Sequence, residues 1–144
     1  PGLRIFGMGP NFIPINGLNQ LQQLLNKNTS WANERSAKDI RKMLCKSSII
    51  ISAWKHNKLI GFGRATSDQV FRAVLWDIVV DKNYQNLGLG RQIVNSILNN
   101  RLLVNVEKIY LMTTSHQNFY SKINFIEEKN QKLMIFKKSV NNSF

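Results

Sequence analysis

The sequence predicts an α/β domain in which an antiparallel run of strands is followed by a strand–helix–strand unit, so that the sheet is mixed. Three β-rich runs separated by short polar turns follow one another between Ser48 and Val80, a pattern typical of an antiparallel meander. The third run leads through a glycine-containing turn into an amphipathic helix over residues 90–101 and a strand over 108–112. A crossover of this length normally gives parallel neighbours.

Two helices are expected before the meander. Leucines at helical spacing predict the first over residues 17–27, and residues 28–35 are expected to form a loop. Ser36 with Asp39 three positions later predicts the N-terminus of a second helix that ends near Lys46. The apolar stripe of this second helix consists of Ile40, Met43 and Leu44.

The remaining segments are expected to be short or loosely ordered. Residues 1–10 predict a loosely ordered or extended lead-in, and residues 11–15 a short strand that Pro14 confines to an edge. A short helix is expected over 115–123 and a last strand over 133–137, whereas residues 139–144 are expected to be loosely ordered. We expect a single domain over residues 1–144.

Composition places the chain among globular proteins. Hydrophobic residues make up 43% and charged residues 19% of the 144 residues, which is enough to build a core. No run approaches the roughly 20 apolar residues that span a bilayer, and the opening segment lacks the features of a secretory signal. Cys45, the one cysteine, fits a reducing compartment, and we expect it to pack inertly beside the stripe of the second helix. With two histidines and one cysteine, no metal site is expected.

The chain is strongly basic. Its net charge is +12, from 20 Lys and Arg against 8 Asp and Glu, which predicts attraction to polyanions. The basic residues are scattered along the sequence, and no groove-reading helix is evident. We therefore expect a general surface property, with neither a membrane nor nucleic acid as a partner.

A glycine turn between strand and helix is the most informative segment. Asp81 closes the third strand, and Gly88 and Gly90 lie where the next helix begins. The first N–H groups of a helix lack intrahelical partners and carry partial positive charge, and glycine lets backbone approach an anion. The turn therefore predicts a phosphate cradle, although the common nucleotide-loop spacings are absent. The alternative is a plain turn whose glycines only relieve strain.

Residues Gln85–Gly90 have the spacing Q-x-x-G-x-G, within the longer pattern strand–D-x-x-Y-Q-x-x-G-x-G-R–helix. This pattern resembles the acyl-CoA pyrophosphate loop of the GCN5-related N-acetyltransferases (GNAT). A second motif, Asn118–Phe125, is similar to the family's F-Y-x-x-x-G-F. The segments Ile60–Asp68 and Trp76–Asp81 resemble the plastid and cyanobacterial branch related to plant serotonin N-acetyltransferase. The resemblance covers roughly residues 48–136.

The resemblance implies a complete enzymatic function. It implies the acyl-CoA N-acyltransferase fold with splayed central strands, and transfer of acetyl from acetyl-CoA, a co-substrate, to a primary amine by direct attack in a ternary complex. The acceptor would be an arylalkylamine or a protein lysine or N-terminal amine. The compartment would be the chloroplast stroma of a plastid or the cyanobacterial cytoplasm, and a homodimer is left open. The alternative is a non-catalytic acyl-CoA-binding or nucleic-acid-associated module.

The resemblance also assigns roles to residues. Backbone groups of Ile78, Val79 and Val80 would hold acetyl and pantetheine, with a bulge freeing an N–H for the thioester oxygen. Tyr120 would be the general acid towards the coenzyme sulfur; alternatively it is a core tyrosine. The implied coenzyme-binding residues are Ile78, Val79, Val80, Gln85, Asn86, Leu87, Gly88, Leu89, Gly90, Arg91 and Phe119.

Asp77 is an unusual carboxylate inside an apolar strand. Alternation predicts that it lies on the face opposite Trp76 and Ile78. Burial would raise its pKa, so it can serve as the catalytic base. Alternatively it is a structural partner for an arginine such as Arg64 on the neighbouring strand.

Several further positions carry weaker expectations. Asn124 stands where the family has glycine, which is tolerable because Asn visits left-handed conformations; Thr113 replaces the family's Asn or Asp. We expect His116 to be a solvent-exposed helix residue. Trp31 and Phe71 can form an apolar wall for the acceptor or, as the favoured interpretation, are packing aromatics.

Overall fold

The computed structural model describes residues 2–8 and 17–138. Their contacts divide the chain into two compact units, Pro1–Met112 and Thr113–Phe144. The first unit contains the sheet and the three longer helices, and it carries most of the structure discussed below.

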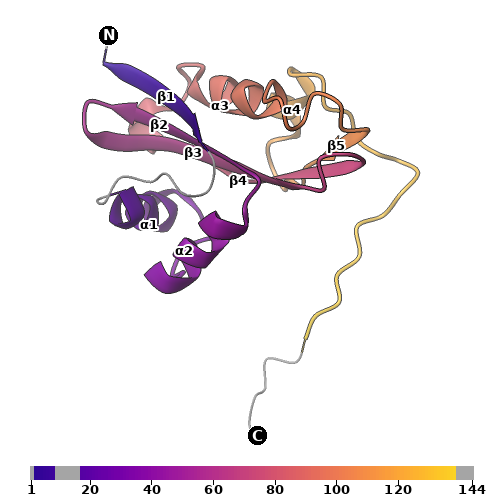
Figure 1. Cartoon of the computed structure of the whole chain (residues 1–144), viewed down its shortest axis with the longest axis horizontal. Helices are drawn as coiled ribbons and strands as arrows, with labels where there is room; N and C mark the ends of the chain where they lie inside the picture. Colours follow the sequence, from indigo (N-terminus) through magenta and orange to yellow (C-terminus); the bar gives the residue numbers. More distant parts are fainter. Residues whose placement is uncertain (1, 9–16, 139–144) are drawn as a thin grey trace, which may run out of the picture. The chain divides into compact units, whose positions relative to one another are not determined.

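The first unit is built on a five-stranded mixed sheet (Figure 1). Its strands are β1 (Leu3–Met8), β2 (Ile49–Lys55), β3 (Lys58–Ser67), β4 (Arg72–Val80) and β5 (Lys108–Tyr110). They lie side by side in chain order. The first four pair antiparallel, and β5 runs parallel to β4 after the crossover. This arrangement confirms the predicted meander, the parallel crossover and the α/β fold class.

Three helices cover the two faces of this sheet. On one face lie α1 (Gly17–Asn28) and α2 (Ala37–Lys46), and on the other lies α3 (Leu89–Leu98) (Figure 1). The predicted start of α2 is confirmed, since the Ser36 hydroxyl accepts a hydrogen bond from the Asp39 N–H at 3.1 Å. Such a cap satisfies one of the N–H groups that the first turn of a helix leaves free.

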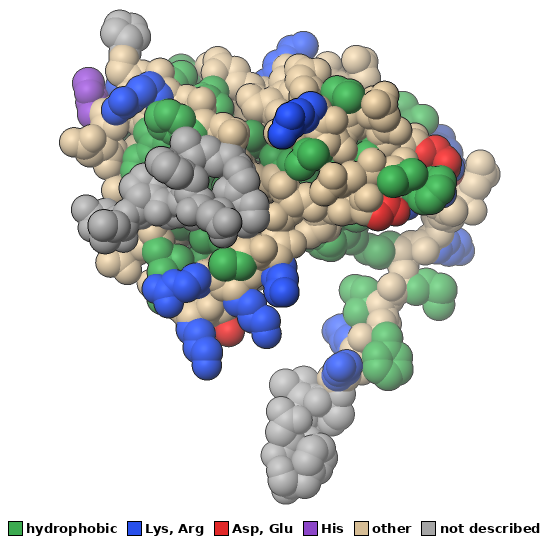
Figure 2. Space-filling model, in the orientation of Figure 1, with side chains coloured by type: hydrophobic (Ala, Val, Ile, Leu, Met, Phe, Trp, Pro, Cys, Tyr) green, Lys and Arg blue, Asp and Glu red, His purple; other side chains and the backbone are tan. Residues whose placement is uncertain are grey.

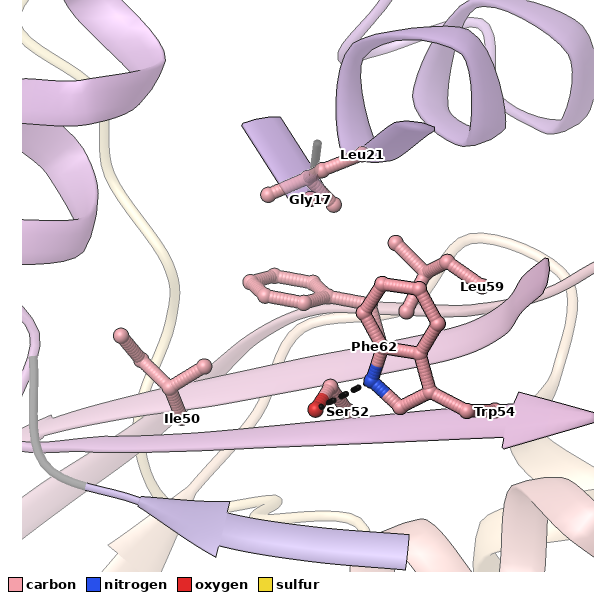
Figure 3. A pocket seen from close by; sticks show the side chains of 7 residues that line it. All are labelled: Gly17, Leu21, Ile50, Ser52, Trp54, Leu59 and Phe62. Carbon is pink, nitrogen blue, oxygen red and sulfur yellow. Dashed lines mark hydrogen bonds between the residues drawn. The ribbon is translucent and has the colours of Figure 1, made fainter. Parts of the chain in front are cut away.

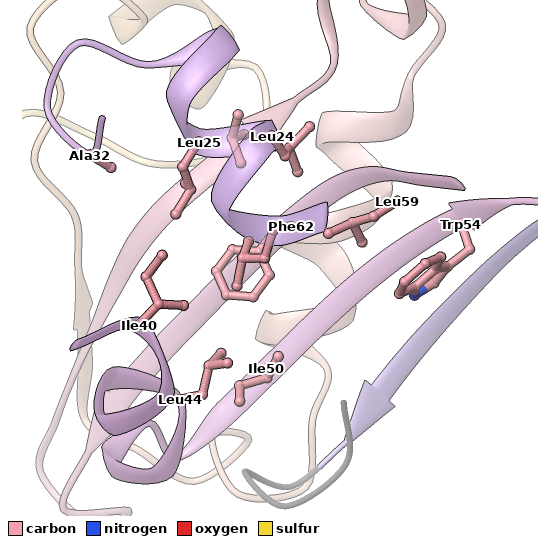
Figure 4. Close-up of a cluster of buried hydrophobic side chains, with 11 residues drawn as sticks. Leu24, Leu25, Ala32, Ile40, Leu44, Ile50, Trp54, Leu59 and Phe62 are labelled. Carbon is pink, nitrogen blue, oxygen red and sulfur yellow. The ribbon is translucent and has the colours of Figure 1, made fainter. Parts of the chain in front are cut away.

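The core beneath α1 and α2 joins helix leucines to alternate residues of the central strands (Figure 4). Phe62 of β3 is fully buried at its centre. Around it lie Leu21, Leu24, Leu25, Ala32, Ile40, Leu44, Ile50, Trp54, Leu59 and Val79. The stripe predicted for α2 is confirmed, because Ile40 and Leu44 are buried and Met43 packs against the cluster.

Helix α3 approaches the opposite face closely because two β3 residues lack side chains. A Cβ added to Gly61 would lie 2.7 Å from Ile93 Cδ1, and one added to Gly63 would lie 2.8 Å from Ile93 Cγ2. Since real Cβ atoms do not come so near other carbons, a side chain at either position would force Ile93 to shift, and glycine allows the closer packing. They bring the N-terminus of α3 next to the end of β4.

The second unit contains a short helix, α4 (Gln117–Ser121). The chain leaves α4 through Asn124, whose φ is 72°. The N–H of Phe125 donates to the carbonyl of Tyr120 at 3.1 Å, and the N–H of Asn124 donates to that of Ser121. These two bonds form the Schellman motif, so the expectation that Asn124 replaces a left-handed glycine is confirmed.

Four expectations about individual segments are affected by the structure. Leu3–Met8, within the predicted lead-in, form the edge strand β1 by pairing with β2. The last strand predicted over 133–137 is wrong, because in the described structure these residues have no strand partner and are exposed. Cys45 is also exposed rather than packed, since it lies on the outer side of α2. The strand expected over 11–15 lies outside the described residues.

A small cavity lies between α1 and the sheet (Figure 3). Its volume is about 10 Å³, and it is lined by Gly17, Leu21, Ile50, Ser52, Trp54, Leu59 and Phe62. The polar atoms of the lining already pair, because Trp54 Nε1 donates to Ser52 Oγ at 3.0 Å. A space of this size is at the lower limit for one water molecule, so it is a packing gap and not a ligand site. Among the described helices, none has the length and apolarity needed to cross a membrane.

Candidate active site

A β-bulge interrupts the pairing of β3 and β4 near the end of β4. Phe62 pairs with Val79 and Arg64 pairs with Trp76, so the single residue Gly63 faces both Asp77 and Ile78. Asp77 takes a left-handed conformation, with φ of 54°. A bulge of this kind removes backbone groups from the regular ladder and changes the direction of the strand. The structure thus confirms the bulge that the resemblance implies.

On its other edge, β4 separates from β5 before the bulge. β5 pairs with Arg72, Ala73 and Val74, and in the described part of the chain its pairing goes no further. The segment from Leu75 to Val80 therefore extends beyond its parallel neighbour, which confirms the predicted splay. Backbone N–H and C=O groups on this edge are free of ladder bonds and can be used by a ligand.

The carboxylate of Asp77 is enclosed by three donor side chains. Arg64 Nε lies 2.8 Å from Oδ2, and Arg35 donates to both oxygens at 3.0 and 3.3 Å. The indole Nε1 of Trp31 donates to Oδ1 at 3.0 Å. The Asp77 side chain is only 4% exposed, so these are bonds in a largely dry environment. They join the loop before α2 to the bulge.

This environment determines the ionisation of Asp77. Burial by itself would raise the pKa, but hydrogen bonds from Arg35 and Arg64, together with their charges, outweigh it and lower the pKa of Asp77 below its ordinary value. The expected raised pKa is therefore not found. The contact with Arg64 that the alternative interpretation predicts is present, and Arg35 is a second partner that sequence reasoning missed. Whether Asp77 acts as the catalytic base stays a prediction.

The structure also corrects the prediction of which face of the sheet carries the Asp77 side chain. Arg64 bonds Asp77 and also lies with its guanidinium 5.8 Å from the centroid of the Trp76 ring, so Trp76 and Asp77 share one face. Ile78 lies on the other face, where it packs near Gly63. Simple alternation fails here because the bulge inserts an extra residue between Trp76 and Val79.

The glycine turn begins with a capped 3₁₀ turn and ends at α3. The Asp81 carboxylate accepts from the N–H of Asn83 at 2.9 Å, which caps η1 (Lys82–Tyr84). Asn86 and Gly88 then adopt positive φ values of 64° and 84°. A Cβ added to Gly88 would meet nothing within 4 Å, so this backbone borders open space. The turn therefore needs glycine for its conformation and not for packing.

The N-terminus of α3 has the properties of an anion site. Its cap, Gly88, makes no side-chain hydrogen bond, and the first turn contains no acidic residue. Leu89 is buried against the sheet, whereas Arg91 is exposed beside it. Free N–H groups, the helix dipole and an adjacent cation together favour negative charge.

Two features of the turn could not be read from the sequence. The Gln85 side chain folds back, and its Nε2 donates to the carbonyl of Val80 at 3.0 Å, so it braces the turn. Lys55 Nζ and Lys58 Nζ each lie 5.7 Å from the centroid of the Tyr84 ring. The hairpin between β2 and β3 thus supplies two cations next to the turn, a proximity that depends on how the strands pair.

The aromatic residues of the second motif lie in the second unit. Tyr120 contacts Phe119 and Phe125 edge-on, with ring centroids 4.9 and 5.8 Å apart. Burial raises the pKa of Tyr120, so its phenol stays protonated at neutral pH. Thr113 accepts from the N–H of His116 at 3.0 Å, and His116 is exposed as expected. The proximity of Tyr120 and Phe119 to the glycine turn stays a prediction.

The two aromatic residues considered for an acceptor wall are not packing aromatics. Trp31 is 56% exposed and Phe71 is 58% exposed. Trp31 is nevertheless held in place, because its Nε1 is bonded to Asp77. Within the described residues, no group of three or more His, Cys, Asp or Glu side chains is arranged to hold a metal ion.

The sequence model of the Acetyltransferase (GNAT) family matches residues 18–128. The chain belongs to the GNAT family. It is 34% identical over 116 residues to an uncharacterized N-acetyltransferase ycf52 from Pyropia yezoensis, covering 77% of this chain and 66% of the relative. It is 39% identical over 72 residues to GCN5-related N-acetyltransferase 2, chloroplastic, from Arabidopsis thaliana, covering 49% of this chain and 28% of that protein.

The fold of this GNAT chain is shared by solved structures of low sequence similarity. A putative GNAT acetyltransferase from Xanthomonas campestris superposes with a TM-score of 0.78 at 18% identity, covering 94% of each chain. The chain spans about two thirds or less of the length of the curated relatives described above. The family membership anticipated from the glycine turn is thus confirmed.

Proposed function

We propose that this GNAT chain transfers acetyl from acetyl-CoA to a primary amine, by direct attack within a ternary complex. The observation that supports this most is the joint position of the splayed end of β4 and the open N-terminus of α3. The end of β4 offers free backbone groups and the N-terminus of α3 offers an anion site. The eight residues from Asp81 to Gly88 join the two.

The pyrophosphate of the coenzyme would bind at the turn. Backbone N–H groups of Leu87 to Arg91 would donate to its oxygens, and the Arg91 side chain would add charge. Gln85 would act by bracing the turn through Val80 rather than by its amide reaching the ligand. These roles rest on the family membership together with the geometry of α3.

The acetyl group would lie at the bulge. As the amine attacks, negative charge develops on the thioester oxygen, and an N–H in the segment Ile78–Val80 would stabilise it. Donors fixed by the sheet need no reorganisation during the reaction. Because Asp77 is ionised and held by two arginines, it would stabilise the bulge conformation and would not take the proton of the amine.

Tyr120 would protonate the departing thiolate, and the proton that the amine nitrogen loses would return through water to the Tyr120 phenolate. A buried, protonated phenol suits a general acid, since it carries the proton at neutral pH. The acceptor would enter beside Trp31, an exposed aromatic side chain fixed to the bulge, which fits an arylalkylamine or the aliphatic stem of a lysine. The chloroplastic relative supports a plastid or cyanobacterial location.

The coenzyme site is tested by calorimetric titration with acetyl-CoA. We expect saturable binding in the wild type and a loss of affinity of at least about 100-fold in Gly88→Glu, because a carboxylate would face the pyrophosphate. Gly88→Asn is the matched control, since Asn tolerates the left-handed backbone without adding charge. An affinity of Gly88→Glu for acetyl-CoA equal to that of the wild type would refute the proposed phosphate cradle at the glycine turn.

The proposed role of Tyr120 as the general acid is tested by steady-state kinetics with a panel of arylalkylamines, polyamines and lysine peptides. Tyr120→Phe is expected to lower kcat by roughly 10²–10⁴-fold and to leave the Kd for acetyl-CoA unchanged, since only the phenol proton is removed. Phe125→Leu, which removes an aromatic neighbour but keeps the phenol, serves as the control. Equal kcat for Tyr120→Phe and the wild type would exclude this role.

A further inference from the structure

The outer face of α2 gathers basic side chains that the sequence suggested were scattered. Four cationic residues of this helix are exposed, and we call them the basic face: Lys38, Arg41, Lys42 and Lys46. At 100° per residue they fall within an arc of about 140°, less than half of the helix circumference. Figure 2 shows Lys and Arg side chains gathered over α2 around one acidic side chain. The acidic residue of this helix is Asp39, in its first turn.

This face is not built for a lipid surface. A helix that lies on a membrane inserts an apolar side between the headgroups. The apolar side of α2 is not available, because Ile40 and Leu44 are 1% and 4% exposed and pack in the core beneath α1. The basic face itself offers no large apolar side chain, since the remaining exposed residues of α2 are Asp39 and Cys45.

The lack of large apolar side chains on the basic face also argues against a folded protein partner. Protein interfaces depend on a central cluster of buried aromatic and aliphatic side chains, with charges at the rim. Along the exposed side of α2 there are charges without such a centre. Binding to phosphates is different, because neutralised charges and released counterions supply the free energy without any apolar contact.

The dimensions of the basic face also suit a phosphate backbone. From Lys38 to Lys46 the helix rises about 12 Å. One strand of a duplex carries a phosphate about every 3.4 Å along its axis, so this length matches roughly three to four phosphates. The length of the basic face is therefore comparable to that of a short stretch of duplex.

We propose that the basic face of α2 is a docking surface for the phosphate backbone of nucleic acid. Recognition is through charge and independent of base sequence, because contacts to phosphate oxygens carry no sequence information. Since α2 begins two residues after Arg35, nucleic acid on this face lies close to the loop that carries Trp31. The proposal concerns a surface separate from the coenzyme site and does not depend on acetyl transfer.

The experiment measures fluorescence anisotropy of a labelled 20-base-pair DNA duplex of mixed sequence, at a series of salt concentrations and without acetyl-CoA. One variant replaces the basic face by glutamine: Lys38→Gln, Arg41→Gln, Lys42→Gln and Lys46→Gln. The control makes the same charge change on exposed lysines of the second unit: Lys129→Gln, Lys132→Gln, Lys137→Gln and Lys138→Gln. Circular dichroism melting verifies that both variants fold.

The expected result separates the two variants. For the basic-face variant the Kd at 50 mM salt rises at least about tenfold, and the slope of log K against log salt becomes shallower by about 3 to 4. The control variant changes the Kd less than about threefold. Equal weakening of both variants would assign the binding to overall charge and overturn the proposal. Tighter binding to polyglutamate or to vesicles with anionic lipid than to the duplex would overturn it in favour of another partner.

Discussion

Two charged regions lie close together along β4 and its following turn, and they differ in how their charge is satisfied. At the bulge, the carboxylate of Asp77 accepts four hydrogen bonds from Trp31, Arg35 and Arg64. At the N-terminus of α3, the partial positive charge of the helix has no side-chain cap and no acidic residue in its first turn.

The difference indicates what each region is for. A buried charge that is fully paired within the protein holds structure together, and removing one partner is costly. A helix end that borders open space and has no internal anion is available for one from solution. The sequence suggested chemistry at both places, and in the structure the carboxylate of Asp77 is paired internally whereas the N-terminus of α3 has no side-chain cap.

The largest expected effect comes from removing the paired carboxylate. Asp77→Ala leaves the partly buried guanidinium groups of Arg35 and Arg64, which are 31% and 14% exposed, without their anion. We therefore expect the free energy of unfolding to fall by about 3 kcal/mol. For a domain of this size the melting temperature would drop by roughly 10 °C or more. Urea unfolding and thermal melting measure both quantities.

The control for this prediction is an ion pair of similar length on the surface. Arg72 Nη1 lies 2.7 Å from Glu107 Oε1, and both side chains are about half exposed. Because water screens this pair, Glu107→Ala is expected to leave the urea midpoint unchanged within error. Similar losses in Asp77→Ala and Glu107→Ala would show that burial of Asp77 does not distinguish the two pairs.

A second prediction compares one substitution at the bulge with one at the glycine turn, in their effects on stability and on coenzyme affinity. Asp77→Asn keeps the shape and the left-handed backbone but removes the charge, so it should lower stability while the Kd for acetyl-CoA stays within about threefold of wild type. Gly88→Glu should show the reverse, with a stability loss limited to roughly 1–2 kcal/mol of backbone strain and loss of coenzyme binding. Titration calorimetry and urea unfolding on both variants measure the pattern. If Asp77→Asn also lost coenzyme affinity beyond tenfold, the division of roles would be contradicted.

The smallest expected effect is on the pH dependence of stability. The folded pKa of Asp77 lies below its unfolded value of about 3.9. Its contribution is therefore fully present above pH about 5 and is lost as the pH falls through the folded pKa. The difference in unfolding free energy between the wild type and Asp77→Asn should be constant from pH 5 to 7 and shrink below pH 4. A difference that widened on acidification would contradict the lowered pKa.

Much of the fold follows from local signals. The hydrophobic spacing of α1, the Ser36 cap of α2, the polar turn between β2 and β3 and the glycines before α3 each act over a few residues, so sequence patterns predict them well. The segment 133–137 shows the limit. Its apolar residues have strand propensity, but a strand also needs a neighbour, and Leu133 to Phe136 are exposed in the described structure.

The sequence by itself determined the order of the longer helices and strands from α1 to β5, the phosphate-cradle spacing of Gln85–Gly90 and the family to which the chain belongs. Only the tertiary structure decided which side chains surround Asp77 and in which direction they shift its pKa. Arg35 and Trp31 lie 42 and 46 residues before it, and they reach it because the loop before α2 packs over the bulge. The pKa of a buried carboxylate depends on which donors surround it in space, and neither strand periodicity nor spacing along the chain contains that information.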